Sequence, residues 1–178
     1  NPLTAVAFLI VGTVLTARQV RPTLTPGVRA ATRIAGATVA AVGLGRGLAY
    51  LVGVEVGLDR LLFPAALAAE SPPNRMAPNT AYTFALTGVA LLLLDTANAR
   101  RALVGQGIAV ILLLQAIVAI TGYVYGVPDL TQVSTFIPMA LNTALAFLAT
   151  AIALAFATPE RGILRSLVLD TDGGRLAR

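Results

Sequence analysis

The sequence predicts an all-α protein: a polytopic membrane helix bundle with five transmembrane helices, an internal helix-pair repeat and a single domain covering residues 1–178. Three observations support this fold class. Apolar residues make up 57% of the chain and charged residues only 12%, whereas about 25% of a soluble domain is charged. The mean hydropathy is +0.82. Long uncharged runs separate the charged positions, and about 20 apolar residues suffice to cross the hydrocarbon core.

The five predicted spans are read from the uncharged runs. In chain order they cover about 2–18, 29–53, 77–95, 102–126 and 137–158. Arg33 and Arg46 interrupt the second run, whereas the fourth and fifth contain no charged residue. The Pro-rich stretch 70–78 predicts a loop directly before the third span, which ends at Asp95.

The distribution of arginine predicts the orientation, because cytoplasmic loops retain positive charge. Arginines without acids follow the first span, Arg100 and Arg101 follow the third, and the C-terminal tail carries four more. The opposite loops mix arginine with acidic residues. We therefore expect the N-terminus outside and the C-terminus in the cytoplasm. The tyrosines agree, because all fall near the predicted outer helix ends, where amphipathic rings are well placed: Tyr50, Tyr82, Tyr123 and Tyr125.

Two segments predict helices that lie on the membrane surface rather than across it. In about 55–68, leucines share a helical face opposite Asp59 and Arg60. In about 159–169, a proline at the first helical position is followed by apolar residues at helical spacing, with arginines on the other side. We expect the first segment at the outer surface and the second at the inner surface.

A short motif recurs along the chain. The stretch APNTAYTF at 77–84 returns as ALNTALAF at 140–147, and NPLTAVAF at 1–8 is a looser copy in which Leu3 replaces Asn. All three share Thr-Ala-x-x-Phe. The pattern predicts a duplicated helix pair, with the third and fifth spans pseudo-equivalent and their phenylalanines turned inward. The motif residues of interest are Asn79, Thr80, Phe84, Asn142, Thr143 and Phe147.

The polar members of this motif have two interpretations. Asn and Thr near a helix start can satisfy backbone donors, and across helices they form hydrogen bonds worth about 1 kcal/mol each. The motif is then a helix-packing device, which is the interpretation that we prefer. Alternatively, the two asparagines form a ligand site. On the packing interpretation, Asn142→Ala should cost on the order of 1 kcal/mol of stability.

Small residues recur at four-residue spacing in and after the second span, which predicts close contact between helices. They are Gly36 with Ala40, Gly43 with Gly47, and Gly53 with Gly57. Most such motifs lie within a bundle, so we prefer internal packing to a homodimer face.

Arg46 is the charge deepest within an apolar run, and an ionisable group in a membrane is a functional candidate that needs a partner. Glu55 or Asp59, one helical turn apart, is the expected partner. Outward snorkelling or a structural ion pair is the preferred interpretation. Ligand or cation sensing is the alternative.

Several functions are excluded by residues that the chain lacks. It contains no His and no Cys, so no imidazole or thiolate can bind zinc, haem or an iron–sulfur cluster, and no Ser-His-Asp set can form. We expect no catalytic residue, no metal site, no cofactor and no enzyme activity; lipids, or pigments held by a neighbouring protein, are the expected small-molecule contacts. The 13 arginines form no stripe, which argues against nucleic acid. No Met precedes Asn1 and no signal-peptide pattern is visible, so we expect a fragment of a longer chain.

Four segments taken together resemble the membrane-embedded N-terminal region of bacterial sensor proteins, in which it precedes PAS domains and a histidine kinase or a diguanylate cyclase. The segments are RMAPNTA, GYVYG, MALNTALAF and GGRLAR. The resemblance covers roughly residues 35–178 and implies a location in the bacterial inner membrane. Family members usually have His where this chain has Asn142, so the chain lacks the obvious titratable group of that motif.

The resemblance implies a noncatalytic sensory input domain that transmits a change in helix packing towards the cytoplasm. The alternative is an accessory subunit that stabilises a larger membrane complex, such as an energy-transducing one, by helix packing. The expected partners are membrane lipids and either other membrane subunits or a second copy of the chain.

Overall fold

The computed structural model describes residues 1–20, 24–54, 57, 63–64, 74–96, 98–133 and 136–157. Over these residues the regular structure is helical and includes no strand, which confirms the predicted all-α class. The elements are α1 (Pro2–Val20), α2 (Pro26–Val52), α4 (Pro78–Leu93), α5 (Ala99–Tyr125), the short 3₁₀ helix η2 (Pro128–Leu130) and α6 (Leu141–Phe156).

Three of these helices, α1, α2 and α5, are long and apolar enough to cross a membrane. The other two, α4 and α6, have 16 residues each, which is shorter than the about 20 residues of a typical span. A membrane helix bundle is therefore supported, while the crossing of all five helices stays a prediction. The predicted surface helices at 55–68 and 159–169 lie outside the described residues, apart from Gly57, Phe63 and Pro64.

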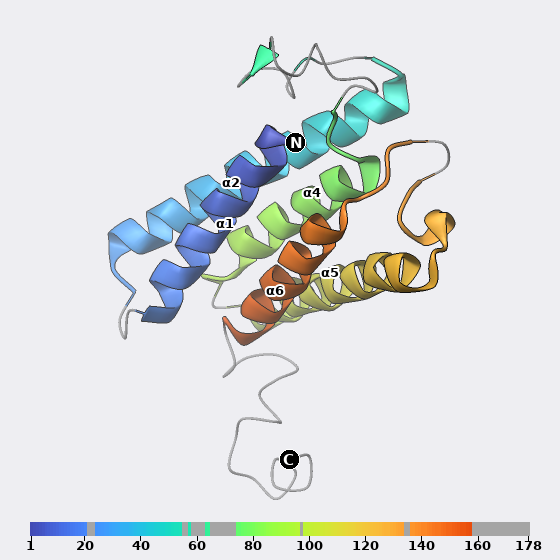
Figure 1. Ribbon diagram of the computed structural model, residues 1–178. Helices are drawn as coiled ribbons and strands as arrows, with labels where there is room; N and C mark the ends of the chain where they lie inside the picture. Colours follow the sequence, from blue (N-terminus) through green and yellow to red (C-terminus); the bar gives the residue numbers. More distant parts are fainter. Residues whose placement is uncertain are drawn as a thin grey trace, which may run out of the picture.

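The helices alternate in direction (Figure 1). In the ribbon view α4 lies between α2 and α5, while α1 packs on α2 and α6 packs mainly on α5. Helices α1, α4 and α6 begin at the same end of the bundle, where α2 and α5 finish. We call this end the tyrosine end, since all four tyrosines are near it: Tyr50, Tyr82, Tyr123 and Tyr125. The opposite end, which carries Arg18, Arg29, Arg33, Arg100 and Arg101, is called the arginine end.

Local sequence explains where the two longest helices begin and end. The Thr25 hydroxyl accepts a hydrogen bond from the backbone N–H of Val28, and the Asn98 side chain accepts from Arg100 and Arg101, so both α2 and α5 start at side-chain caps. Each ends at a glycine with positive φ: 71° at Gly53 and 64° at Gly126. Glycine adopts this left-handed conformation without a Cβ penalty, which stops the helix there.

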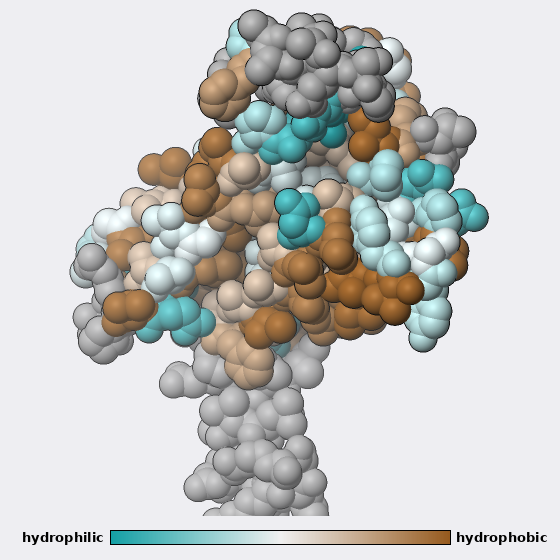
Figure 2. Space-filling view, in the orientation of Figure 1, coloured by the Kyte–Doolittle hydropathy of each residue, from teal (hydrophilic) through white to brown (hydrophobic). Residues whose placement is uncertain are grey.

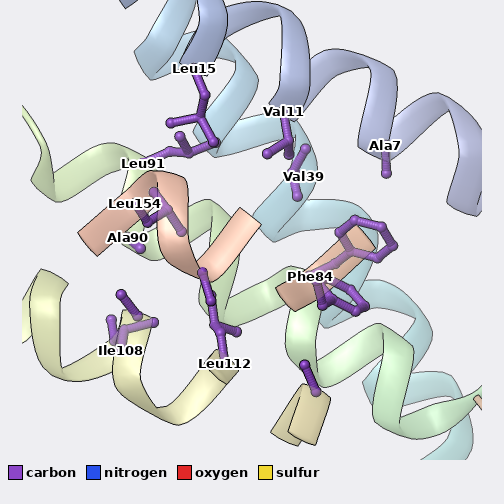
Figure 3. Packing of buried hydrophobic residues seen from close by; sticks show 14 of the residues in the cluster. Ala7, Val11, Leu15, Val39, Phe84, Ala90, Leu91, Ile108, Leu112 and Leu154 are labelled. Carbon is purple, nitrogen blue, oxygen red and sulfur yellow. The ribbon is translucent and has the colours of Figure 1, made fainter. Parts of the chain in front are cut away.

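Burial differs strongly among the helices. In α4, eleven of the 16 residues are buried, so this helix forms the centre of the bundle. In α1 only five of the 19 are buried, and they recur every three or four residues. Figure 3 shows Ala7, Val11 and Leu15 in a row on the side of α1 that faces the other helices, with Val39 and Leu91 near them. This single apolar stripe is what attaches α1 to the core.

Much of the outer surface is apolar. Figure 2 shows several hydrophobic patches on the visible face, interrupted by hydrophilic groups, one of which lies near its centre. On α5, large exposed side chains include Val110, Ile111, Leu114 and Ile117. Exposed apolar patches of this kind mark contact with lipid or with another protein.

Candidate functional site

The three copies of Thr-Ala-x-x-Phe meet in space through their phenylalanines. The ring centroids of Phe8 and Phe84 are 4.8 Å apart, those of Phe8 and Phe147 are 4.7 Å apart, and those of Phe84 and Phe147 are 4.8 Å apart. The rings are inclined by about 60° to one another, which is a favourable arrangement for aromatic pairs. We call these residues the phenylalanine cluster.

The phenylalanine cluster joins α1, α4 and α6 near the tyrosine end, since each ring lies six residues after the first residue of its helix. Phe84 and Phe147 are both 0% exposed, and Phe8 packs on them while remaining partly exposed. The two phenylalanines singled out in the sequence thus lie in contact in the core. The third copy of the motif, which is looser in sequence, supplies the third ring.

The two asparagines of the motif are placed differently. Asn79 is 6% exposed; its Nδ2 donates to the backbone oxygen of Thr131 at 2.8 Å, and its Oδ1 accepts from the N–H of Thr80 at 3.0 Å. Asn142 is exposed, and its Oδ1 accepts from the N–H of Thr143 at 2.9 Å. Asn79 therefore links two segments far apart in sequence, whereas Asn142 only accepts from a backbone N–H in the first turn of its own helix.

Of the two roles expected for the motif asparagines, Asn142 has the local one in the described part of the chain: it accepts from a backbone N–H at the start of its own helix and bonds to no other described helix. The chain that follows α5 covers the start of α4 at Thr131, but no described segment covers the start of α6 at Asn142. The threonines follow the same division, since Thr80 is buried and Thr143 is only half-buried. Among the described residues the two asparagines share no hydrogen bond.

Glycines bring α2 and α4 into backbone contact. A Cβ atom added at Gly43 would lie 2.6 Å from the backbone oxygen of Ala81, and one added at Gly88 would clash with the backbone of Ala40. At Gly47 an added Cβ would lie 2.7 Å from the Tyr82 ring. Gly88 was not singled out in the sequence, although it lies four residues after Phe84, on a helix already expected to pack.

Two of the glycines expected in close helix contact have no such contact. A Cβ atom added at Gly53 or Gly57 meets no described atom within 4 Å. Gly53 instead ends α2 with its positive φ, and its N–H donates to the backbone oxygen of Ala49. The four-residue spacing continues past the end of the helix by coincidence, because spacing predicts contact only while the chain is helical.

Arg46 is buried at 4% exposure near the tyrosine end of α2. Its Nη2 donates to the Tyr50 hydroxyl at 3.3 Å, and its guanidinium lies 5.0 Å from the centre of the Tyr50 ring. A cation over an aromatic ring is stabilised by the ring's quadrupole. The acids expected as partners, Glu55 and Asp59, lie outside the described residues.

Side chains of three helices bind backbone oxygens of the loops at the tyrosine end. The Tyr50 hydroxyl donates to Met76 at 2.6 Å, the Tyr123 hydroxyl donates to Met139 at 2.7 Å, and Asn79 donates to Thr131. The N–H of Met139 also donates to the oxygen of Thr131 at 2.7 Å. We call these bonds the loop-anchoring bonds. They tie the loops before α4 and before α6 to the helices below.

A buried ion pair lies at the arginine end and was missed in the sequence. Arg18 Nη1 is 2.9 Å from Asp95 Oδ1, and the two side chains are 5% and 9% exposed. The same Nη1 is 3.4 Å from the Thr32 hydroxyl, which in turn donates to the backbone oxygen of Val28. The sequence does contain a signal for this pair. Arg18 continues the buried stripe of α1, and Asp95 ends the third predicted span on the same predicted side of the membrane.

The described residues include no group of three or more acidic, His or Cys side chains that could hold a metal ion. Comparisons with protein-family models, with curated proteins and with solved structures found no match. The features of the described residues that bear on function are therefore the phenylalanine cluster, the loop-anchoring bonds, Arg46 with Tyr50, and the Arg18–Asp95 pair.

Proposed function

We propose that this chain is a noncatalytic integral membrane module that acts as a sensory input domain. It crosses a bacterial inner membrane five times, with the tyrosine end outside and the arginine end in the cytoplasm. The arginine-rich loops and the tyrosines support this orientation. The lengths and composition of α1, α2 and α5 support the spanning arrangement.

The observation that carries the proposal is the set of loop-anchoring bonds. Three of these bonds join a side chain of a helix to the backbone of a loop that a stimulus outside the membrane would touch first, and the fourth joins two loop residues, Met139 and Thr131. Asn79 lies five residues before Phe84 on α4, so a displacement of the loop at Thr131 acts directly on a helix that carries part of the phenylalanine cluster. A packed aromatic core repacks between discrete arrangements, which suits a two-state switch.

A change at the outer loops would then reach α1 and α6 through Phe8 and Phe147. Both helices run from the phenylalanine cluster towards the cytoplasmic side, where α6 leads into the C-terminal segment. The output is a shift in how these helices pack, biased by a ligand or by the membrane.

The test is a comparison of Tyr123→Phe, which removes the bond to Met139, with Tyr125→Phe on the same helix as the control. The chain, with whatever sequence follows Arg178 in its gene, is placed in nanodiscs and hydrogen exchange is measured along α6. We expect faster exchange at the start of α6 and a changed profile in its last turns for Tyr123→Phe alone. A change confined to the loop would contradict transmission along the helix.

A second candidate function is that of an accessory subunit that stabilises a larger membrane complex by helix packing. One observation favours it: a 630 Å³ groove runs along α1 and is lined in part by Gly12, Thr13 and Thr16. Small and hydroxyl-bearing residues suit the close approach of another transmembrane helix.

Two observations separate the candidates. A gene that continues into PAS, kinase or cyclase sequence supports the sensory input domain. Gentle solubilisation of native membranes, followed by size separation, tests the accessory subunit: recovery in a fixed ratio with other membrane proteins supports it. Recovery of the chain only as monomer or dimer contradicts the accessory role.

A further inference from the structure

Helix α1 is attached to the rest of the bundle less firmly than the other described helices. Its backbone lies close to α2 and α6, it reaches α4 through the contact of Phe8 with Phe84, and Gly12 makes no close approach to another helix. An open surface groove of 540 Å³ runs along the contact of α1 with α2 and is lined by Leu9, Thr13, Ile34 and Thr38, among others. By contrast, α2 and α4 touch backbone to backbone at Gly43 and Gly88.

The two ends of α1 are held by different kinds of contact. Near the tyrosine end, Phe8 belongs to the phenylalanine cluster, and the side chain of Asn1 donates to the backbone oxygen of Asn74. At the arginine end, Arg18 bonds to Asp95 just after α4 and to Thr32 on α2. Arg18 therefore contacts both α2 and the segment directly after α4, which belong to the more closely packed part of the bundle.

The Arg18–Asp95 pair is not fully satisfied. Arg18 Nε and Asp95 Oδ2 are buried and have no hydrogen-bond partner among the described residues, so the pair makes a single bond instead of the two parallel bonds that Arg and a carboxylate can form. A buried pair with such gaps recovers little of its desolvation cost, so it is a poor source of stability. The best-attested use of such a pair is to select one arrangement over another.

We propose that the Arg18–Asp95 pair is a latch that fixes the position of α1 against α2 and α4. When the pair is broken, α1 pivots at the phenylalanine cluster and its arginine end moves away from Thr32, while α2, α4 and α5 keep their places. The open groove along the contact of α1 with α2 shows that these helices pack less closely than α2 and α4, whose glycines bring the backbones into contact. The inference concerns the mobility of α1 and holds for either proposed function.

The absence of cysteine from the chain makes a direct test practical, since spin labels can be placed without removing native thiols. One label pair, at Thr16→Cys on α1 and Val104→Cys on α5, reports on the arginine end of α1. A reference pair, at Ala37→Cys on α2 and Val104→Cys, reports on the rest of the bundle. All three positions are exposed. Distance distributions are measured by pulsed electron paramagnetic resonance in nanodiscs.

Arg18→Met and Asp95→Asn should each shift the 16–104 distance or add a second maximum, and leave the 37–104 distribution unchanged. The exchanged pair Arg18→Asp with Asp95→Arg should return the distribution towards that of the parent. Arg33→Met, which removes an exposed arginine from α2 at the same end, is the matched control and should change neither distance.

Three results would overturn the latch. Unchanged 16–104 distributions in both single variants would show that other contacts hold α1. Equal broadening of both label pairs would show that the ion pair stabilises the whole bundle instead. If Arg33→Met changed the 16–104 distance as much as Arg18→Met does, the change would result from the loss of one positive charge and not from the loss of the Arg18–Asp95 pair. Should Arg18→Met fail to fold, Asp95→Asn carries the same test because it removes the charge and keeps the side-chain shape.

Discussion

The starts of α4 and α6 share a sequence and differ in surroundings. Both carry Asn-Thr-Ala-x-x-Phe, and both place the phenylalanine in the same aromatic cluster. Yet eleven of 16 residues are buried in α4 and five of 16 in α6. The comparison shows that the repeat determines which residues meet in the core, while the segments packed around each copy determine what its polar residues do.

Two neighbours account for the difference. The chain after α5 covers the start of α4 and accepts the hydrogen bond from Asn79. Along its length, α4 contacts α2 through Gly88, whereas α6 contains no glycine and has Ala151 at the corresponding position, four residues after its phenylalanine. Helix α4 is therefore enclosed on several sides, while α6 packs mainly on α5.

The largest expected loss of stability tests the feature that α4 and α6 share, which is a phenylalanine buried in the phenylalanine cluster. Phe84→Ala and Phe147→Ala each remove a fully buried ring, and each should destabilise the protein by about 3–5 kcal/mol. Phe8→Ala should cost less because Phe8 is partly exposed. Purified variants are heated in detergent, and the fraction that remains folded at each temperature is measured by size-exclusion chromatography. A loss at Phe147 far smaller than at Phe84 would break the equivalence of the two copies.

The next largest loss of stability tests a feature that α4 has and α6 lacks, which is backbone contact with α2 at a glycine. Gly88→Ala places a Cβ against the backbone of Ala40, so we expect a loss of about 1–3 kcal/mol or failure to fold. The matched control is Ala149→Leu, a larger change at an exposed position of α6, which should stay within about 0.5 kcal/mol of the parent. Both are compared by thermal unfolding under one set of conditions. If Gly88→Ala is neutral, α2 and α4 are not in backbone contact.

The helices, their class and the inward position of Phe84 and Phe147 could be anticipated from the sequence, because apolar runs and a repeated motif are local patterns, whereas the contact of these rings with Phe8 was not predicted. The different burial of Asn79 and Asn142 could not, because it depends on where the chain after α5 folds back. The Arg18–Asp95 pair was missed for a similar reason: its members lie 77 positions apart, and only the packed bundle brings them together. Gly53 shows the reverse error, in which a local spacing suggested a contact that the end of α2 prevents.

A smaller loss of stability is expected when Asn79, the buried asparagine of the repeated motif, is replaced. Asn79→Ala removes the hydrogen bond to Thr131 and should cost about 1 kcal/mol, the range measured for hydrogen bonds between membrane helices. The backbone oxygen of Thr131 keeps its bond from Met139, which limits the loss. Unfolding curves measure the effect, and Asn79→Asp, which keeps the shape but lacks the donor, should lose at least as much. Full stability of Asn79→Asp would show that the donated bond contributes nothing.

The smallest effect is expected at the exposed copy, and it separates packing from recognition. Among the described residues Asn142 makes one bond, which it accepts from the N–H of Thr143 in the first turn of its own helix, so Asn142→Ala should cost at most about 0.5–1 kcal/mol, the lower range for one net hydrogen bond. Asn142→Ser keeps a side-chain oxygen that can accept from the backbone and should recover part of that loss, whereas a ligand bound through the amide group would not tolerate the change. The two variants are compared by unfolding in detergent, with and without an extract of native membranes. If the extract stabilises the parent but neither variant, Asn142 contacts a partner or ligand outside the chain, and the motif is then a packing device in α4 and a recognition element in α6.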